Sequence, residues 1–482
     1  MIRYCNVVAA ARAMPYFLQI RLCAVVTAFC LIVTPAFSRQ IQRTDSAAIT
    51  DALLADGATA GTQEPGSTQE PGSTQEPGSV QKPGNTQEPA STQELAKGQA
   101  GSPEPEDEPK SYMDIYGFVM LDMGYDVKTN DPNWFDVNRP SKLPAFPGEF
   151  GKDGNTYFSV RQSRFGVKGE QYTSIGKLKY EFEFDMFGVG VDAGQTTIRP
   201  RQYYGEIGPI LAGQTNSVFM DGDVFPNVVE YWGPNGMVFL RNPQLRYTPL
   251  NGATKLMFAL EKPGASGDAG TLADRIDLSN IHARFQFPDL SGAISHTWKS
   301  KSYLRAAAIV RDFKIDNVAN NVTQNVVGWG ANASSNIVFH KNILRLQYTY
   351  GEGIENYMND APIDVAPRLV PSSIIQPIKG KAVPMYGLSA YLDHNWSKKW
   401  SSAIGYSRLV MHNTNLQTPE AFHAGEYAST NLLYSPFKNF LAGGEFQYGR
   451  RYNFSNGFNP NDFRIQFSFK YSFDFRVLGK TS

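Results

Sequence analysis

The sequence contains little cysteine and, after its first segment, no long apolar run. Its three cysteines, Cys5, Cys23 and Cys30, all lie near the start of the 482-residue chain. If this segment is removed on export, the remaining chain has no disulfide and no cysteine metal site. No later run approaches the roughly 18 apolar residues that a spanning helix needs, which excludes a helical membrane protein. The net charge is zero, which argues against nucleic acid as a partner.

Patterns for catalysis and for metal or cofactor binding are also missing. The six histidines are scattered and lack metal-ligand spacing. The stretch "GVGVDAG" at 188–194 has the glycines of a dinucleotide fingerprint, but it lies between predicted strands with no helix to receive a phosphate. "DGDVFPN" at 221–227 lacks the terminal bidentate glutamate of a calcium loop. We therefore predict that the protein is not an enzyme and binds neither a metal nor a cofactor.

The N-terminal segment has the pattern of an export signal. Arg3, Arg12 and Arg21 precede the apolar run 22–33, and "AFS" at 36–38 supplies small residues at a cleavage spacing. A positively charged start, a short apolar run and a small-residue site are typical of secretory signal peptides. We predict a signal peptide over residues 1–38.

Residues 39–110 form a low-complexity segment. "TQEPGS" occurs three times in succession from residue 62, and degenerate copies follow. Proline every six residues blocks helix and sheet, and there is little apolar surface to bury, so we expect a disordered, extended linker. A spacer is one interpretation. The alternative is an outer-membrane anchoring or structural protein whose periplasmic Pro-rich segment binds the cell wall or a partner.

After residue 110 the sequence changes to alternating polar and apolar segments. In "KLKYEFEFDMF" at 177–187, Lys177, Lys179, Glu181, Glu183 and Asp185 share one parity, while every second residue between them is apolar. Successive side chains of a strand point to opposite faces. A strand with one fully charged and one fully apolar face fits a sheet between lipid and water, whereas a soluble sandwich rarely has charge at every position of its wet face.

Similar alternation recurs along 111–482 in about sixteen segments of roughly 9–14 residues, the length of tilted membrane-spanning strands. Short turns such as "LNGA" and "SKKW" alternate with long loops, among them 126–155, 216–237, 315–324 and 352–384. Backbone groups cannot stay unpaired in lipid, so such a sheet must close. We predict an all-β fold: a transmembrane antiparallel β-barrel of about sixteen strands, in the bacterial outer membrane, surrounded by lipid and lipopolysaccharide. A barrel of this size leaves an aqueous channel, so the predicted function is a pore.

Several stretches resemble a known family. "RQYYGEIGPILAGQTNSVFMDGDVFPNVVEYWGPNG" at 201–236 resembles the strand, turn and inward-folded third loop of trimeric bacterial porins. "NLLYSPFKNFLAGGEFQYGRR" at 431–451 with "FRIQFSFKYSF" at 463–473 resembles the last hairpins of DcaP-like porins, and "RQSRFGVKGE" and "YGEGIENYM" are similar to the same family. The resemblance covers roughly residues 111–473. It implies a homotrimer of sixteen-stranded barrels that admits small anionic organic molecules such as dicarboxylates.

The chain departs from this family at both ends. The Pro-rich repeat replaces an N-terminal coiled-coil segment, so a role of that segment does not transfer. The family also ends on a phenylalanine that the barrel-assembly machinery recognises, whereas "DFRVLGKTS" follows Phe473 here.

Side chains facing the lumen would sort solutes by charge. Parity assigns a set of basic side chains to the pore lining: Arg164, Lys168, Lys179, Arg246, Arg284, Arg345, Arg451, Arg464 and Lys470. The acidic pore-lining candidates are Glu181, Glu183, Asp185 and Glu445. The parity of Arg199, Arg201, Arg241 and Arg305 stays open, because Pro200 and Pro243 permit bulges. The basic majority favours anions, and the acidic row on 177–187 is the main competing influence.

The third-loop candidate is predicted to fold inward and to form the constriction. It carries acidic residues among aromatic ones, and we expect its acidic groups to contact arginines of the wall. The constriction candidates are Asp221, Asp223, Glu230 and Tyr231.

Overall fold

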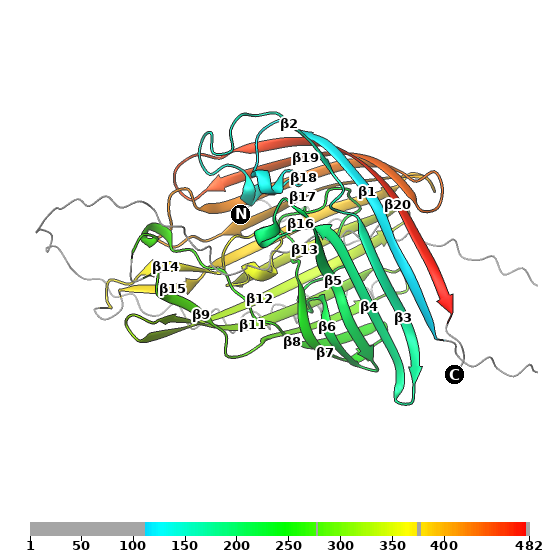
Figure 1. Ribbon diagram of the computed structural model, residues 1–482, viewed down its shortest axis with the longest axis horizontal. Coiled ribbons are helices and arrows are strands. Elements are labelled where there is room, and N and C mark those ends of the chain that lie inside the picture. The colour runs from blue at the N-terminus through cyan, green and yellow to red at the C-terminus, as the bar shows by residue number, and fades with distance from the viewer. Residues whose placement is uncertain (1–110, 276–277, 374–376, 479–482) are drawn as a thin grey trace, which may run out of the picture. The chain divides into compact units, whose positions relative to one another are not determined.

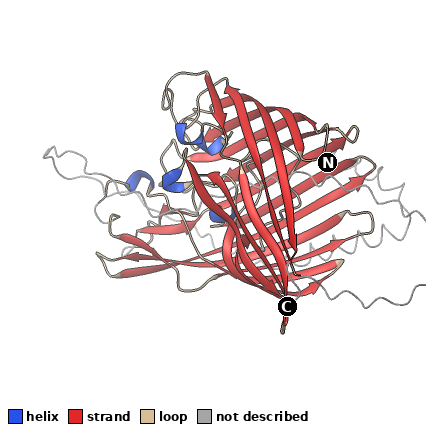
Figure 2. Cartoon of the chain, turned by 45° about the vertical axis from the view of Figure 1, so that its right-hand side comes forward, coloured by secondary structure: helices blue, strands red, loops and turns tan. Residues whose placement is uncertain are grey.

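The computed structural model describes residues 111–275, 278–373 and 377–478. The predictions of a signal peptide over 1–38 and a disordered linker over 39–110 lie outside these residues. The described chain consists of strands, loops and short 3-10 helices, with no α-helix in these ranges. Figure 2 shows that strands form most of it, with a few short helices between them. No helix in these ranges has the length and apolar character needed to cross a membrane. The predicted all-β class is confirmed.

The strands are numbered along the chain in Figure 1. Their bounds are β1 Tyr112–Asp126, β2 Asn155–Ser159, β3 Arg164–Thr173, β4 Gly176–Phe187, β5 Thr196–Ile207, β6 Ile210–Asn216, β7 Arg241–Asn251, β8 Thr254–Glu261, β9 Ile281–Arg284, β10 Asp289–Thr297, β11 Tyr303–Asn317, β12 Val322–Phe339, β13 Asn342–Glu352, β14 Val365–Leu369, β15 Ile378–Ala382, β16 Pro384–Asn395, β17 Trp400–Met411, β18 Phe422–Tyr434, β19 Phe440–Asn453 and β20 Asn461–Leu478. The 3-10 helices are η3 Pro132–Trp134, η4 Pro140–Lys142, η5 Gly190–Asp192, η6 Gly270–Leu272 and η7 Glu355–Tyr357.

All strands except β14 and β15 belong to one antiparallel sheet. β2 and β3 both pair with β1, and β9 and β10 both pair with β11, so each of these pairs is one interrupted spanning strand. β20 pairs with β1 along the whole of β1, and the two strands lie side by side in Figure 1. The sheet is therefore a closed barrel of sixteen spanning strands, as predicted. Closure leaves no edge strand with unpaired backbone groups in lipid.

The two faces of β4 follow the parity expected from the sequence. Phe182 is 50 % exposed on the outer wall, whereas Glu183 and Asp185 are buried inside. On β1, Val119 is 61 % exposed and Asp122, three positions later, is buried. The apolar rows therefore form the lipid-facing surface, and the charged rows face the lumen.

The connections also follow the predicted alternation of short turns and long loops, with one exception. The expected long loop at 315–324 is wrong: β11 continues to Asn317 and β12 starts at Val322, so only a short turn joins them. The strands extend because Phe313, Ile315 and Val326 gain an apolar contact with Ala382 in the loop after β13. That loop, residues 353–383, contains the hairpin β14–β15, which the sequence did not indicate.

Residues 474–478 of the C-terminal extension belong to the barrel wall. β20 continues past Phe473, and its last residue in the sheet, Leu478, pairs with Tyr112 at the start of β1. Arg476 donates two hydrogen bonds to the carboxylate of Asp114, at 2.7 and 2.9 Å. The residues after Phe473 therefore complete the pairing of the first strand.

Candidate functional site in the barrel lumen

The acidic row of β4 is paired with arginines of the adjacent wall. Arg201 contacts both Glu183 and Asp185, each at 2.7 Å. Arg199 lies 2.7 Å from Asp185, and Arg164 lies 3.7 Å from Glu183. All of these side chains are largely buried. The two carboxylates therefore do not offer free negative charge to a passing solute.

This pairing depends on a bulge that the sequence left open. The register between β4 and β5 shifts between Glu183 and Phe184, opposite Pro200. A bulge inserts an additional residue into one strand and redirects its side chains. As a result, both Arg199 and Arg201 reach the acidic row from inside the barrel.

The remaining charges of β4 also have partners. Glu181 accepts hydrogen bonds from the hydroxyl groups of Tyr116, at 2.6 Å, and Tyr204, at 2.8 Å. Lys179 forms a salt bridge of 2.8 Å with Glu206 on β5. The row thus forms a cross-strand network along the inner wall.

Two predicted pore-lining arginines, Arg464 and Arg451, are bonded to wall and loop groups inside the barrel. Arg464 is fully buried, and it binds both carboxylate oxygens of Asp126, at 2.5 and 2.9 Å. Arg451 donates to the carbonyl groups of Ser141, at 2.9 Å, and Leu143, at 3.1 Å. Arg451 therefore fixes the loop 127–154 to the wall.

Arg345 and Arg284 have different surroundings. Arg345 lies 2.6 Å from Asp393 and also donates to the carbonyl oxygen of Asp223 in the third loop, at 2.6 Å. Arg284 lies on the short strand β9 and forms an exposed salt bridge of 2.5 Å with Asp316. The structure therefore does not bring Arg284 together with the other predicted lumen residues.

Two predicted lysines form no salt bridge among the residues that the structure describes. Lys168 is exposed, and its Nζ lies 5.0 Å from the ring centre of Tyr116. Lys470 lies 5.4 Å from the ring centre of Phe118. On the inner face of the described barrel, both lysines therefore lie against an aromatic ring and not against a carboxylate.

The loop 217–240, which joins β6 to β7, crosses the lumen. Asn332 on β12 donates to the carbonyl of Phe219 at 3.0 Å, and the amide of Gly236 donates to Ser407 on β17 at 2.8 Å. On β19, Glu445 accepts from the amide of Val229 at 2.8 Å. Because these strands are far from β6 and β7 in the sheet order, the loop spans from one wall to the other. Glu445, a predicted pore-lining acid, is a buried anchor of this loop.

The acidic groups of this loop are not held as expected. Asp221 accepts hydrogen bonds from Tyr303, at 2.7 Å, and Ser334, at 2.5 Å. Wall arginines contact the loop backbone instead: Arg345 binds the carbonyl of Asp223, and Arg305 binds loop carbonyls upstream of it. The prediction that wall arginines bind the carboxylates of Asp221 and Asp223 was wrong. The carboxylate of Asp221 is bonded to neutral hydroxyl groups, and the arginines bind carbonyl groups of the loop.

Glu230 and Tyr231 lie deep in the loop. The Tyr231 hydroxyl donates to Asp185 and accepts from Arg201 at 3.0 Å, so the loop joins the charge network of the wall. Glu230 accepts from the amides of Asn138, at 3.1 Å, and Gly233. Burial raises the pKa of Glu230 to about 7, although the backbone donors partly oppose this effect.

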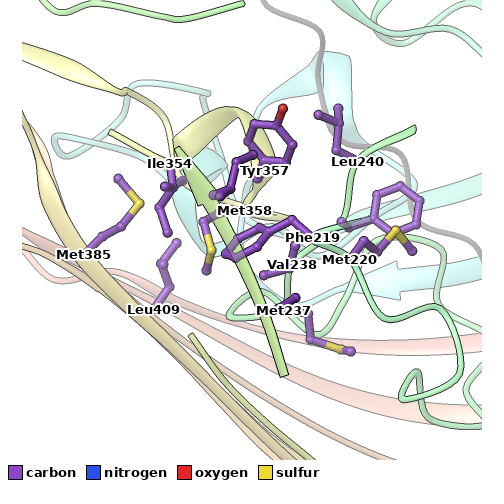
Figure 3. Close-up of a cluster of buried hydrophobic side chains, with 14 of the residues drawn as sticks. Phe219, Met220, Met237, Val238, Leu240, Ile354, Tyr357, Met358, Met385 and Leu409 are labelled. Atoms are coloured by element: carbon purple, nitrogen blue, oxygen red, sulfur yellow. The ribbon is translucent and has the colours of Figure 1, made fainter. Parts of the chain in front are cut away.

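An apolar core fills part of the interior at the long-loop end of the barrel. In Figure 3, side chains of loop 217–240 meet those of loop 353–383 and of the wall; the labelled residues are Phe219, Met220, Met237, Val238, Leu240, Ile354, Tyr357, Met358, Met385 and Leu409. Beside it, Arg139 of loop 127–154 is stacked between Trp134, at 4.2 Å, and Trp232, at 4.1 Å. Three loops therefore narrow the lumen, whereas the sequence predicted only one.

A basic pocket lies at the short-turn ends of β5 to β8. It has a volume of about 240 Å³, and the residues that line it are Glu206, Gly208, Pro209, Leu211, Arg246, Thr248, Asn251 and Lys255. Arg246 bonds to neutral acceptors, Gln244 and the carbonyl of Asn216. Lys255 shows neither a hydrogen bond nor a salt bridge within the described ranges. The arginines Arg246 and Arg305 and the carboxylates of Glu206 and Asp223 all act on it electrostatically.

The sequence prediction included Arg246, left the parity of Arg305 open and missed Lys255. The alternation of β8 carried a signal for Lys255, because Lys255, Met257 and Ala259 share the inner face. The part of the chain that the structure describes contains no group of three or more His, Cys, Asp or Glu side chains that could hold a metal ion.

Known proteins are similar to this chain in both sequence and fold. A family model described as "DcaP outer membrane protein" matches residues 93–360, more than half of the chain. The outer membrane channel DcaP of Acinetobacter baumannii has a similar structure, with a TM-score of 0.64, 20 % identity, and coverage of 76 % of this chain and 98 % of that one. The search of curated proteins found no match.

Two further solved porins show weaker similarity. An anion-selective porin from Comamonas acidovorans has a TM-score of 0.48 at 10 % identity, with coverage of 76 % of this chain and 100 % of that one. Salmonella typhi OmpF, in complex with daunomycin, has a TM-score of 0.48 at 11 % identity, with coverage of 75 % and 97 %.

Proposed function

Because the chain belongs to the DcaP outer membrane protein family and forms a closed sixteen-strand barrel, it is an outer-membrane channel, and we propose that it favours small organic anions, dicarboxylates among them. The observation that carries this proposal is the basic pocket, which Arg246 and Lys255 line and near which Arg305 lies. None of the three forms a salt bridge with a carboxylate in the described ranges. We propose no catalytic role.

The acidic row was the main argument against anion preference. In the structure Glu183 and Asp185 are paired with arginines of the wall, which weakens this argument. Glu181 is bonded to two tyrosine hydroxyl groups and keeps its negative charge. Positive side chains at a narrow aqueous passage lower the barrier for anions and raise it for cations. An arginine fork can bond both oxygens of a carboxylate, which favours organic acids.

Lys255 is the most suitable position for a test, because no described hydrogen bond or salt bridge depends on it. We expect Lys255→Gln to shift the reversal potential in a salt gradient toward cation preference and to weaken current block by a four-carbon dicarboxylate. The shift should be larger at low salt, where screening is weaker. Lys177→Gln is the matched control: it removes the same charge from the same end of the barrel, but Lys177 is paired with Glu170 at 3.0 Å.

Two results would contradict the proposal. A wild-type channel that prefers cations would exclude anion selection. Equal shifts in Lys255→Gln and Lys177→Gln would show that overall charge matters and that the pocket has no special role.

We further propose a homotrimer, which the resemblance to trimeric porins supports. Single insertions into a planar bilayer should then give conductance in three equal steps, each closing independently under high voltage. Single uniform steps at every protein concentration would exclude this assembly.

A further inference from the structure

Two arginines lie on the lipid-facing side of the barrel. Arg408 on β17 shares its parity with Ile404, which is 59 % exposed, while the intervening Ser407 is fully buried. Arg450 on β19 shares its parity with Phe446, which is 44 % exposed, while its neighbour Arg451 points inward to loop 127–154. A charged side chain on this surface costs energy unless it finds a polar partner.

The two guanidinium groups have one carboxylate between them. Arg408 donates to Glu426 on β18 at 2.9 Å, and Glu426 also accepts from the hydroxyl of Tyr452 at 3.0 Å. Arg450 lies 4.7 Å and Arg408 5.8 Å from the ring centre of Tyr452. The cluster carries a net charge of +1 from these three ionised groups.

The cluster also has unused donors. The Nε atoms of Arg408 and Arg450 are buried and have no hydrogen-bond partner in the described structure. Arg450 forms no salt bridge within the described ranges. Its guanidinium group makes a cation–π contact with the ring of Tyr452. The geometry thus provides two adjacent cations that share a single carboxylate, that of Glu426.

The depth of the cluster indicates which anion is available. Arg408 is three positions from the end of β17 at Met411, and Arg450 is three positions from the end of β19 at Asn453. Both strand ends lead into the longer loops, which face the outside in outer-membrane barrels, whereas short turns face the periplasm. Aromatic residues such as Tyr406 and Tyr452 mark the level of the lipid head groups. The cluster therefore lies near the head groups of the outer leaflet.

We propose that Arg408 and Arg450, supported by Tyr452, bind a phosphate group of lipopolysaccharide on the outer wall of the barrel. A phosphate matches the planar donor fork of arginine and supplies the charge that Glu426 alone does not. Farther along the same outer wall, the exposed Ile404, Phe446 and Leu432 would contact acyl chains of the same lipid. This site is separate from the lumen and does not depend on the selectivity of the channel.

The proposal predicts that the affinity for phosphorylated lipid A depends on Arg450. Purified protein in neutral detergent would be titrated with bisphosphorylated lipid A, and binding would be followed by native mass spectrometry and by the unfolding temperature, which a bound ligand raises. We expect Arg450→Gln to weaken the affinity about tenfold, the loss of one charge-assisted contact, and Arg408→Gln with Arg450→Gln to weaken it further. Arg476→Gln is the matched control, because Arg476 is exposed at the opposite end of the barrel.

The outcomes separate the alternatives. Binding of dephosphorylated lipid A as tightly as bisphosphorylated lipid A would overturn the phosphate contact. Equal stabilisation by inorganic phosphate alone would indicate a site for free anions and would overturn the lipid assignment. If the double variant separates the assembly into monomers while lipid A still binds, the cluster is a contact between subunits and the proposal is wrong. Unchanged β content of the variants by circular dichroism establishes that folding is intact.

Discussion

The buried Glu230 makes the packing of loop 217–240 sensitive to pH. Burial raises its pKa from the usual 4.5 to about 7. Below about pH 4.5 the carboxyl group is protonated in both the folded and the unfolded protein, so pH has no effect through this group. Between about 4.5 and 7 it ionises only when the protein unfolds, so the free energy of unfolding falls as the pH rises. Above pH 7 it is ionised in both states and the loss is complete.

The size of the effect follows from the shift. One pKa unit corresponds to about 1.4 kcal/mol, so the shift of Glu230 corresponds to about 3 kcal/mol between pH 4.5 and 7. Glu230→Gln keeps the shape of the side chain and cannot ionise. Both oxygens of Glu230 accept backbone hydrogen bonds, from Asn138 and Gly233, so the amide loses one of these bonds at every pH. The variant therefore differs from the wild type by a constant cost and by the pH-dependent part.

Chemical unfolding of the barrel in lipid vesicles at several pH values would measure this difference. We expect the free energy of unfolding of Glu230→Gln, relative to the wild type, to rise by about 3 kcal/mol from pH 4.5 to 7 and then to level off. Titrating groups that do not interact with Glu230 contribute equally to both proteins and cancel in the difference. A difference that stays constant over this range would refute the reasoning, because it would show that the amide donors keep Glu230 ionised in spite of its burial.

Other predictions concern the wall. Arg201→Ala removes a positive charge that compensates the buried carboxylates of Glu183 and Asp185, and we expect the free energy of unfolding to fall by about 3–5 kcal/mol in the same assay. Lys177→Ala breaks only an exposed pair, so we expect a loss of less than about 1 kcal/mol. Removal of residues 474–482 takes away the strand pairing from the start of β1, so we expect the barrel to unfold at a lower temperature, with a loss of about 2–3 kcal/mol for several backbone hydrogen bonds. Equal thermal stability of the truncated and full chains would contradict a structural role of this extension.

Local patterns were sufficient to predict the wall. Alternation on β4 and on β20 determines which side chains face lipid, because the period of a strand is fixed by its backbone and needs no knowledge of its neighbours. The number of alternating segments predicted sixteen strands. The alternation of short and long connections predicted which end of the barrel carries the turns and which carries the loops. The family resemblance from 161–170, 350–358 and the last hairpins pointed to the same barrel. The family match and the DcaP channel structure confirm that assignment.

The pairing of charges was decided only by the tertiary structure. The sequence shows that Glu183 and Asp185 are acidic and face inward, but it does not show that a bulge beside Pro200 brings Arg201 between them. The same holds for Arg464, which parity assigns to the pore and which is paired with both carboxylate oxygens of Asp126. A partner on another strand depends on the register and on local bulges, and these arise from the whole sheet.

The sequence pattern also did not predict which loop residues fill the lumen. Apolar residues in loops 127–154, 217–240 and 353–383 have no strand period, so the pattern that separates lipid from water along the wall does not apply to them. Their position depends on which wall residues meet them across the barrel, as Asn332 meets Phe219 and Glu445 meets Val229. The sequence by itself determined a lipid-facing barrel with a charged interior, because each strand position follows from its immediate neighbours. Only the closed barrel decided which of those charges stay unpaired, because that depends on contacts between segments far apart in the chain.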